Sequence, residues 1–434
     1  MNTNVLPGFQ ELLPKEQIAF DRLKRTIEEI YQLYGFRPIE TPILERAEIL
    51  LSKSGGETEK QIYQFEKGDT KLAMRFDLTV PLARYVVKNQ NDLVFPFKRY
   101  AIDRVYRGEK PQAGRFREFY QCDIDVVGRD TLDLSYDAEI PSIIASIFSS
   151  LELDFTIRIN NRKILNGLLD SFDIKDKVSV LRVLDSIEKI GKEKTKSELK
   201  EIGLNEKQIE NVFAFYRLNE KENKEILNSL TYLDITSDIF KQGVEELKTV
   251  MNEIDVLGIS SNVKIDLSVA RGLDYYTGTV YETVLNKYPE IGSVCSGGRY
   301  DDLANTFTNQ KFPGVGISIG LTRLFDQLKN KDVFVMEDET PTAVLVLPLT
   351  DNREASLKLA DTLRENFIPT EVASFGNMKK SLTYANKLNI PYVVFIGEDE
   401  IKNGTYTIKD MVTGGQKEIS QINILDIFNS NESN

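Results

Sequence analysis

Arginine and lysine gather in one short stretch of an otherwise acidic chain. Between Lys98 and Arg129, eight basic residues stand against five acidic ones, whereas the whole chain of 434 residues has a formal charge of −12. Two strand-like halves flank a loop bounded by Gly108 and Gly114, which predicts a hairpin. Because guanidinium groups offer planar donor pairs to phosphate, a basic hairpin suits ATP or nucleic acid. An edge hairpin charged against aggregation is the alternative.

Four further segments combine polar or charged side chains with glycine turns or the start of a helix. They are 74–84, with Asp77 and Thr79 ahead of a helix; 268–282, with Arg271 and Gly272 at the entrance of a strand predicted over 275–282; 296–302; and 314–324, with Arg323 on the helix that follows. Taken singly, each also fits a structural turn or a core strand, with Arg271 in a structural ion pair. Together, arginines and glycine turns in one domain indicate chemistry on a nucleotide and a carboxylate.

The chain contains no histidine, which excludes Ser-His-Asp and Cys-His catalysis and imidazole metal ligands. Gly316-Ile-Ser-Ile-Gly320 matches the nucleophile elbow of hydrolases, but no histidine exists to activate Ser318, so we interpret the match as chance. Neither G-x-G-x-x-G nor a P-loop is present. The two cysteines, Cys122 and Cys295, cannot make a structural zinc site. A metal would therefore need carboxylate ligands, whose identity the sequence leaves open.

Length and composition are those of a soluble globular protein. Hydrophobic residues make up 41% and charged residues 28% of the chain, and the length predicts two or three domains. No apolar run approaches the ~20 residues that span a bilayer, so no membrane association is expected. The first residues lack the basic and apolar blocks of a signal peptide. With only two cysteines, the expected compartment is the reducing cytoplasm.

The periodicity of the apolar residues predicts an α+β catalytic domain with a mainly antiparallel sheet, a helical insertion and a C-terminal α/β domain. The expected boundaries are 1–160 and 256–328 for the catalytic domain, 161–255 for the insertion, 329–342 for a linker and 343–434 for the C-terminal domain. In this last domain, apolar runs near 343–347, 369–373 and 392–396 alternate with two helical patterns. That alternation is typical of a βαβαβ unit with parallel strands.

The combination resembles the histidyl-tRNA synthetases, a family of class II aminoacyl-tRNA synthetases, over about residues 5–427. Arg271-Gly-Leu-Asp-Tyr-Tyr276 is similar to a signature of the family. The basic hairpin and the segment around Arg323 resemble class II motifs 2 and 3, and residues 34–42 resemble motif 1, the dimer-interface element. The resemblance implies ATP-dependent activation of histidine to histidyl-adenylate, with release of pyrophosphate, and its transfer to the 3′ end of tRNA.

The resemblance also implies roles for individual residues. Arg107 and Arg323 are similar to the motif arginines that grip ATP phosphates, and Arg271 to the catalytic arginine that bridges the histidine carboxylate and the α-phosphate. The positions similar to those around bound histidine are Asp77, Thr79, Arg115, Gln121, Asp125, Tyr276 and Tyr300, and Arg115 is also expected to contact ATP. Lys110 and Gln112 fall in the motif 2 loop, which reaches the acceptor end of tRNA.

The family further implies histidine, ATP, Mg²⁺ and the tRNA for histidine as ligands, a homodimer, and anticodon binding by the C-terminal domain. Two alternatives stand beside it: a histidine-sensing regulatory subunit of ATP phosphoribosyltransferase, and a synthetase for threonine, proline or glycine. The regulatory subunits usually lack the catalytic arginine and the anticodon-binding domain, and this chain has counterparts of both. Synthetases for threonine, proline or glycine share the C-terminal domain type, and the Arg271 to Tyr276 signature argues against them. The sequence departs from the usual family pattern at residues 74–79, which resemble the eukaryotic and archaeal form, and at Thr322, where a glutamate frequently precedes Arg323.

Overall fold

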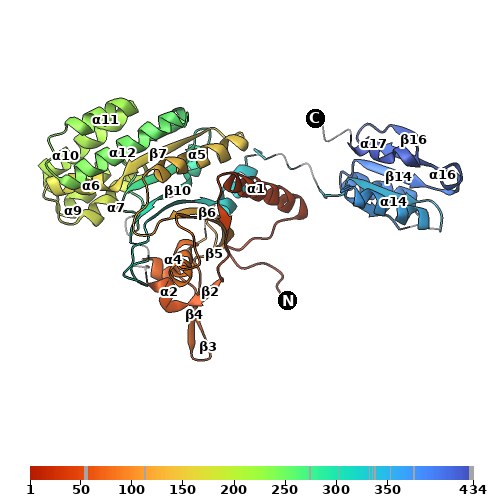
Figure 1. The fold of residues 1–434 in the computed structure, drawn as a ribbon, viewed down its shortest axis with the longest axis horizontal. Coiled ribbons are helices and arrows are strands. Elements are labelled where there is room, and N and C mark those ends of the chain that lie inside the picture. Colours follow the sequence, from red (N-terminus) through yellow and green to blue (C-terminus); the bar gives the residue numbers. More distant parts are fainter. Residues whose placement is uncertain are drawn as a thin grey trace. The chain divides into compact units, whose positions relative to one another are not determined.

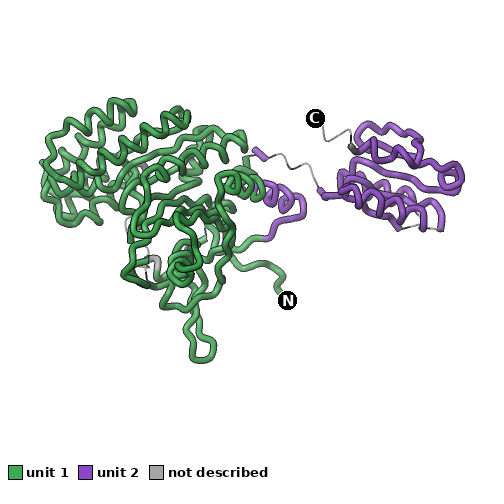
Figure 2. Tube along the Cα trace, in the orientation of Figure 1, with its two compact units in different colours: residues 1–10, 24–331 green, residues 11–23, 332–434 purple. Residues whose placement is uncertain are grey.

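The computed structural model describes ten stretches of the chain: residues 1–52, 57–111, 114–272, 275–302, 304–331, 333–334, 336, 339–351, 353–374 and 377–429. The chain divides into two compact units (Figures 1 and 2). The first comprises residues 1–10 and 24–331, and the second residues 11–23 and 332–434. The domain boundaries expected from the sequence remain predictions. Among the described residues, no helix is long and apolar enough to cross a membrane.

An eight-stranded sheet forms the centre of the first unit, with the strand order β1-β5-β6-β11-β10-β9-β7-β8. Only the outermost pairs, β1 with β5 and β7 with β8, are parallel. The strands are β1 (Arg37–Pro38), β5 (Phe97–Tyr106), β6 (Glu118–Val127), β7 (Phe155–Asn161), β8 (Val263–Ile265), β9 (Thr279–Leu285), β10 (Ser293–Tyr300) and β11 (Gly314–Gly320). The mainly antiparallel sheet predicted from the sequence is thereby confirmed.

The long hairpin of β5 and β6 contains most of the basic stretch. Its register runs from Phe97 opposite Val127 to Tyr106 opposite Glu118. Beside it, β2 (Leu44–Arg46), β4 (Thr70–Met74) and β3 (Gln64–Lys67) form a small separate sheet. Among the described residues up to Lys331, the α-helices outside residues 161–255 are α1 (Pro14–Leu33), α2 (Ala47–Leu51), α3 (Glu57–Gln61), α4 (Thr79–Asn89), α5 (Ser135–Ser150) and α13 (Leu321–Lys329).

The segment predicted to be a helical insertion is helical. It contains α6 (Arg162–Ser171), α7 (Lys177–Asp185), α8 (Ile187–Ile190), α9 (Lys192–Glu201), α10 (Glu206–Tyr216), α11 (Asn223–Tyr232) and α12 (Asp238–Val256). The longest of these helices, α12, packs against α6, α5 and β7. It does so through apolar residues at helical spacing, including Val244, Leu247 and Met251. This helical segment therefore packs against the eight-stranded sheet and α5.

The prediction of a strand over 275–282 was partly wrong, because β9 begins only at Thr279. The backbone N–H groups of Tyr275 and Tyr276 both donate to the carbonyl of Gly272 at 2.9 Å, which forms a turn in place of a ladder. Gly272 has a φ of +64°, and a Cβ there would lie 2.1 Å from the Tyr276 ring. The two tyrosines are therefore placed by a glycine turn ahead of the strand.

The second unit contains the expected alternation: β12 (Val344–Pro348), α14 (Glu354–Glu365), β13 (Thr370–Val372), α15 (Met378–Lys387) and β14 (Tyr392–Ile396). Alternate residues of β12 enter two hydrophobic clusters, Val344 and Val346 in one and Leu345 and Leu347 in the other. The parallel prediction missed two antiparallel strands, β15 (Thr405–Asp410) and β16 (Gln416–Ser420), which extend the sheet beyond β14. The sequence of β15 does alternate, with Tyr406 and Ile408 buried between polar residues, whereas that of β16 is polar and mostly exposed. The remaining helices of this unit are α16 (Glu398–Asn403) and α17 (Ile424–Asn429).

A buried ion pair ties α5 to the sheet. Arg299 on β10 donates through Nε to both carboxylate oxygens of Asp137 at 3.1 and 3.0 Å, and donates to the carbonyls of Leu132 and Asp133. Asp137 is fully buried and Arg299 is 7% exposed.

We expect Asp137→Ala to lower the free energy of unfolding by about 3–5 kcal/mol, because it leaves a buried guanidinium without its counter-ion. Urea unfolding checks this against the exposed control Asp234→Ala, and a loss below about 1 kcal/mol would contradict it.

Candidate active site

Four of the predicted arginines line one cavity of about 450 Å³ at one face of the central sheet: Arg107, Arg115, Arg271 and Arg323. Gln121 lines the same cavity, together with Glu109, Ser296 and Ser318. These residues come from the β5–β6 hairpin, the segment before β9, β10, β11 and α13. The fold thus brings together side chains that lie more than 200 positions apart in the sequence.

Separate contacts hold three of these guanidinium groups. The Arg107 Nε donates to the carbonyl of Phe76 at 3.0 Å, and its guanidinium lies over the Phe119 ring at 5.2 Å. Arg271 forms an ion pair with Glu282 of β9 at 2.7 Å. Arg323 donates to the carbonyl of Ile291. Their hydrogen bonds to the backbone and to Glu282 fix their positions, so the cavity does not depend on a ligand to order them.

Arg323 shows that positive charge accumulates here. Burial lowers its pKa, and the cations Arg115 and Arg271 lower it further. Arg115 is itself half-exposed and lies 3.9 Å from Glu109. Several like charges facing one cavity repel one another, and an anion that enters relieves that repulsion. The cavity is therefore suited to a polyanion.

A second group of predicted residues forms a buried acidic pocket on the same sheet face. Asp125 of β6 accepts a hydrogen bond from the Tyr300 hydroxyl at 2.7 Å and forms an ion pair with Arg99 of β5 at 2.5 Å. Tyr300 packs edge-on against Tyr275, whose ring meets Tyr276 at 5.4 Å. Asp125, Arg99 and Tyr300 are at most 3% exposed. The pocket therefore offers fixed donors and acceptors in a medium nearly free of water.

Glycines make room for these side chains. A Cβ on Gly316 would lie 2.4 Å from an oxygen of Asp125, and one on Gly314 would lie 2.4 Å from the Tyr300 ring. A Cβ on Gly298 would lie 2.9 Å from the Tyr276 ring. The glycines of β10 and β11 therefore leave the space that the side chains of the acidic pocket occupy.

Asp77 and Thr79 lie where β4 gives way to α4. Asp77 accepts the backbone N–H of Val80 at 3.0 Å, as a helix-capping carboxylate does. Burial raises the pKa of Asp77, while Val80 and Arg107 lower it. Thr79 is the first residue of α4 and is half-buried. Lys110 is exposed in the hairpin loop, and Gln112 lies outside the described residues.

The sequence predicted no functional role for Arg99, Asp123, Glu282 or Ser318, all of which belong to this face of the sheet. Gln121, Asp123 and Asp125 alternate along β6, so their side chains share one face. That spacing was the available signal for Asp123. Thr322 accepts the backbone N–H of Tyr120 at 2.8 Å, so it ties α13 to β6 and does not contact Arg323 through this bond.

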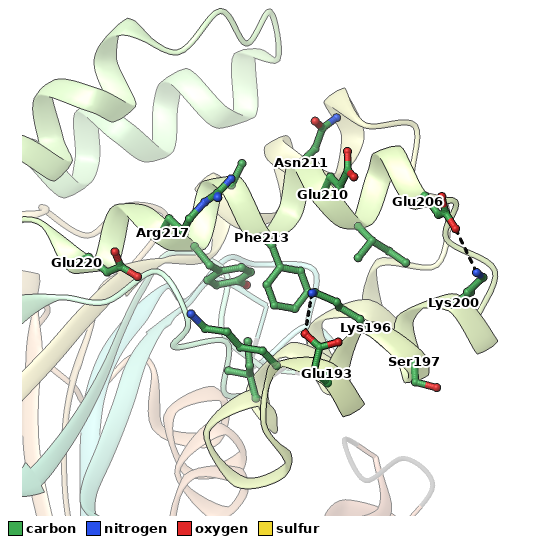
Figure 3. Close-up of a pocket in the computed structure, with 15 residues that line it drawn as sticks. Glu193, Lys196, Ser197, Lys200, Glu206, Glu210, Asn211, Phe213, Arg217 and Glu220 are labelled. Atoms are coloured by element: carbon green, nitrogen blue, oxygen red, sulfur yellow. Dashed lines mark hydrogen bonds and ion pairs between the residues drawn. The ribbon is translucent and has the colours of Figure 1, made fainter.

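A larger cavity of about 940 Å³ lies in the helical insertion between α9 and α10 (Figure 3). Four of its charged side chains form two ion pairs: Lys196 lies 2.8 Å from Glu193, and Lys200 lies 3.4 Å from Glu206 (Figure 3). None of the predicted site residues is among the described residues that line it. The arginine cavity is therefore the candidate active site despite its smaller size.

Comparison with known proteins identifies the family. The family model described as Histidyl-tRNA synthetase matches residues 8–324, and that described as Anticodon binding domain matches residues 343–431. The chain is 54% identical to a histidine–tRNA ligase of Clostridium tetani over 96% of both chains. It is 44% identical to one of Finegoldia magna over 95% of this chain and 96% of the other. The chain belongs to the histidyl-tRNA synthetase family.

Solved structures agree with this membership. A histidyl-tRNA synthetase from Nostoc sp. PCC 7120 matches with a TM-score of 0.89 and 41% identity over 97% of both chains. A protein from Bacillus halodurans described as an ATP phosphoribosyltransferase regulatory subunit/histidyl-tRNA synthetase matches with a TM-score of 0.77 at 20% identity, over 91% of this chain and 98% of that one. At that identity, the second likeness concerns the fold alone. The regulatory alternative is therefore the less supported of the two.

The buried carboxyls make the stability of the fold dependent on pH. Burial raises the pKa of Asp123 to about 7 and that of Asp125 to about 6, although Arg99 opposes both shifts. Unfolded aspartate has a pKa of about 3.9, so the folded chain holds more protons between about pH 4 and pH 7. The stabilisation from these bound protons is complete below about pH 4 and is lost as the pH rises through about 7.

We therefore expect Asp123→Asn, which cannot ionise, to melt at a higher temperature than the unsubstituted chain at pH 8. The difference should shrink as the pH falls toward 5, because the Asp123 carboxyl then becomes neutral in the folded chain. Differential scanning calorimetry at the two pH values measures this, and Asp234→Asn, at an exposed position, is the matched control. A variant that melts lower at both pH values would contradict the assignment of Asp123 as a buried, costly charge.

Proposed function

We propose that this chain is a histidine–tRNA ligase whose arginine cavity joins histidine to ATP and then passes histidine to the 3′ end of its tRNA. The observation that carries the proposal is the adjacency of two sites on one sheet face. Four arginines surround a cavity suited to a polyanion, and a buried pocket of carboxylates and tyrosines adjoins it. A carboxylate, a triphosphate and an imidazole each find complementary groups there.

The first step brings two anions together. A carboxylate oxygen of histidine bonds to the α-phosphorus of ATP, the bond from that phosphorus to the bridging oxygen breaks, and pyrophosphate leaves with the electron pair. No proton needs to move, so no histidine or other general base is required. The barrier is charge repulsion and positioning, both of which fixed guanidinium groups reduce. Arg271 lies between the cavity and Glu282 and acts on the carboxylate and the α-phosphate, while Arg107 and Arg323 hold the phosphates.

The acidic pocket recognises histidine. Asp125 and Tyr300 supply an acceptor and a hydroxyl for the imidazole nitrogens, and the Tyr276 ring forms a wall. Asp77, Thr79, Gln121 and Arg115 surround the α-amino and carboxylate groups. A competing amino acid without the ring nitrogens leaves these buried polar groups unpaired, which can discriminate by ~10⁴–10⁵.

Magnesium enters as part of the substrate MgATP. Among the described residues, no group of three or more Asp, Glu or Cys side chains is arranged to hold a metal ion. The residues therefore do not fit a metal held by the protein alone. Mg²⁺ commonly binds through substrate phosphates with few protein ligands.

The C-terminal residues 343–434 bind the anticodon, and the linker at 329–342 joins them to the catalytic domain. Lys110 and Gln112 reach the acceptor end of the tRNA. The matched family description for residues 343–431 supports the first assignment. The protein acts as a cytoplasmic homodimer, with residues 34–42 at the interface. ATP–pyrophosphate exchange with each of the twenty amino acids tests the whole proposal, and exchange without preference for histidine would reject it.

Arg271→Ala should slow adenylate formation by ~10²–10³, because one charge-stabilising contact of the transition state is lost. The histidine and ATP affinities should change much less, since the contact matters most in the transition state. Arg271→Lys should recover only part of the rate, because an ammonium lacks the planar fork. Single-turnover adenylation measures the rate, with Arg182→Ala on the exposed face of α7 as control. Near-normal turnover would make Arg271 a structural ion-pair partner of Glu282.

A chain that ends after Lys331 should still form histidyl-adenylate but charge tRNA poorly. With a net charge of −12, the chain cannot hold tRNA by overall attraction, so the contacts must be local and shared between domains. The salt dependence of tRNA binding should become shallower, by up to ~0.7–0.9 in slope for each phosphate contact removed. Exchange and charging are measured on the same sample. If both activities disappear together with the folded state, the C-terminal domain has a structural role.

A further inference from the structure

Gln121, Asp123 and Ser318 form a row at the base of the arginine cavity. In the ladder of β6 and β11, Asp123 stands opposite Ser318 and Gln121 opposite Gly320. Residues opposite each other share a face, so the three polar side chains project together. The Gln121 Nε2 donates to the Ser318 hydroxyl oxygen at 2.9 Å. Ser318 and Gln121 both line the cavity, whereas Asp123 is only 3% exposed.

The hydrogen bonds of this row have a defined direction. The Ser318 hydroxyl has one proton to donate and an oxygen that can accept. Asp123 stands directly across the ladder from Ser318, and an ionised carboxylate there can only accept the hydroxyl proton. The hydroxyl oxygen must then accept from an amide N–H₂ and not face an amide carbonyl. The carboxylate of Asp123 thus decides, through Ser318, which end of the Gln121 amide points inward.

The opposite end of that amide has no partner within the described protein. The Gln121 Oε1 is buried and receives no hydrogen bond from the described residues, and the same holds for one oxygen of Asp123. A buried acceptor left without a donor costs free energy, which a donor supplied by a ligand recovers. Gln121 therefore presents an oxygen to whatever cation or N–H group occupies the site.

We propose that Asp123 and Ser318 are positioning residues that fix the Gln121 amide with its oxygen toward the α-ammonium of the bound amino acid. The inference rests on the proposed function, since it concerns how the histidine substrate is held. With the amide reversed, the Nε2 group would face the ammonium, and two donors would oppose each other. Neither residue touches the reacting atoms, and each acts through Gln121.

The same arrangement explains Gly316-Ile-Ser-Ile-Gly320, which matches a nucleophile elbow by its spacing alone. On the face that carries Ser318, its neighbours along β11 are Gly316 and Gly320, opposite Asp125 and Gln121. The glycines leave the space above them to those two side chains, so Ser318 is the one residue of this triplet that contributes a functional group. The Gly316 to Gly320 segment therefore lines the binding site and is not a hydrolytic motif.

A purely structural role is the competing account, in which Asp123 neutralises the buried Arg99. Arg99 already forms an ion pair with Asp125. The carboxyl of Asp77 also interacts electrostatically with both Arg99 and Asp125. The two accounts differ for the isosteric change Asp123→Asn. Asparagine replaces one carboxylate oxygen by an N–H₂ group, and with that group toward Ser318 the hydroxyl donates its proton to the Gln121 oxygen. The Gln121 amide would turn, and its nitrogen would face the substrate.

The test measures KM for histidine and for ATP in pyrophosphate exchange at pH 8, where Asp123 is ionised. Asp123→Asn should raise KM for histidine by about tenfold or more, and change KM for ATP and kcat by less than about twofold. Ser318→Ala should raise KM for histidine by only about threefold, since the amide becomes free without being reversed. Ser171→Ala, whose hydroxyl bonds within α6, is the control.

The double variant Asp123→Asn/Ser318→Ala decides the matter. Without the Ser318 hydroxyl, the asparagine introduced by Asp123→Asn cannot reverse the amide, so the double variant should bind histidine better than Asp123→Asn alone. A double variant equal to or worse than Asp123→Asn, or single variants whose KM for histidine is unchanged or rises in step with that for ATP, would overturn the proposal. Absence of histidine-dependent exchange in the unsubstituted chain would instead reject the proposed function, so the two failures are distinguishable.

Discussion

The structure depends on concentrating positive charge in one cavity of an acidic chain. Four guanidinium groups that face the same space repel one another, and groups of the protein itself hold three of them in place. The chain does this with a carbonyl for Arg107, a carboxylate for Arg271 and a carbonyl for Arg323. These anchors come from the loop before α4, from β9 and from the turn before β10. The eight-stranded sheet is the frame that keeps all three at a fixed separation.

In the acidic pocket beside that cavity, buried carboxyl groups are concentrated in place of guanidinium groups. Asp77, Asp123 and Asp125 surround a single guanidinium, Arg99, and burial raises the pKa of all three carboxyls. Such a pocket is costly for the empty fold and favourable for a ligand that brings positive charge. Stability and substrate binding therefore make opposing demands on the same residues, which is a common feature of active sites. The glycines at 298, 314 and 316 make this density of side chains possible.

The absence of histidine is consistent with the chemistry. Joining a carboxylate to a phosphate requires charge compensation and orientation, which arginine supplies at every accessible pH. Recognition of an imidazole requires acceptors and donors such as carboxylates and hydroxyls, and the buried Asp125 and Tyr300 are one group of each kind. Adenylate formation calls for no group that titrates near pH 7 as an acid or base. An enzyme that handles histidine thus needs none of its own.

The sequence by itself determined the family, the mainly antiparallel sheet, the helical segment within the first unit, the βαβαβ alternation of the second unit and the arginines of the cavity. These features are recorded locally, in periodicity, glycine turns and short motifs such as Arg271 to Tyr276. Only the tertiary structure decided that β9 begins after a turn at Gly272, that β15 and β16 extend the second sheet, and that Glu282 holds Arg271. The tertiary structure also decided the hydrogen-bond partner of Ser318, because Gln121 lies 197 positions away on a neighbouring strand. The physical reason is register: which side chains face each other across a sheet depends on how distant strands align, and no local pattern encodes that alignment.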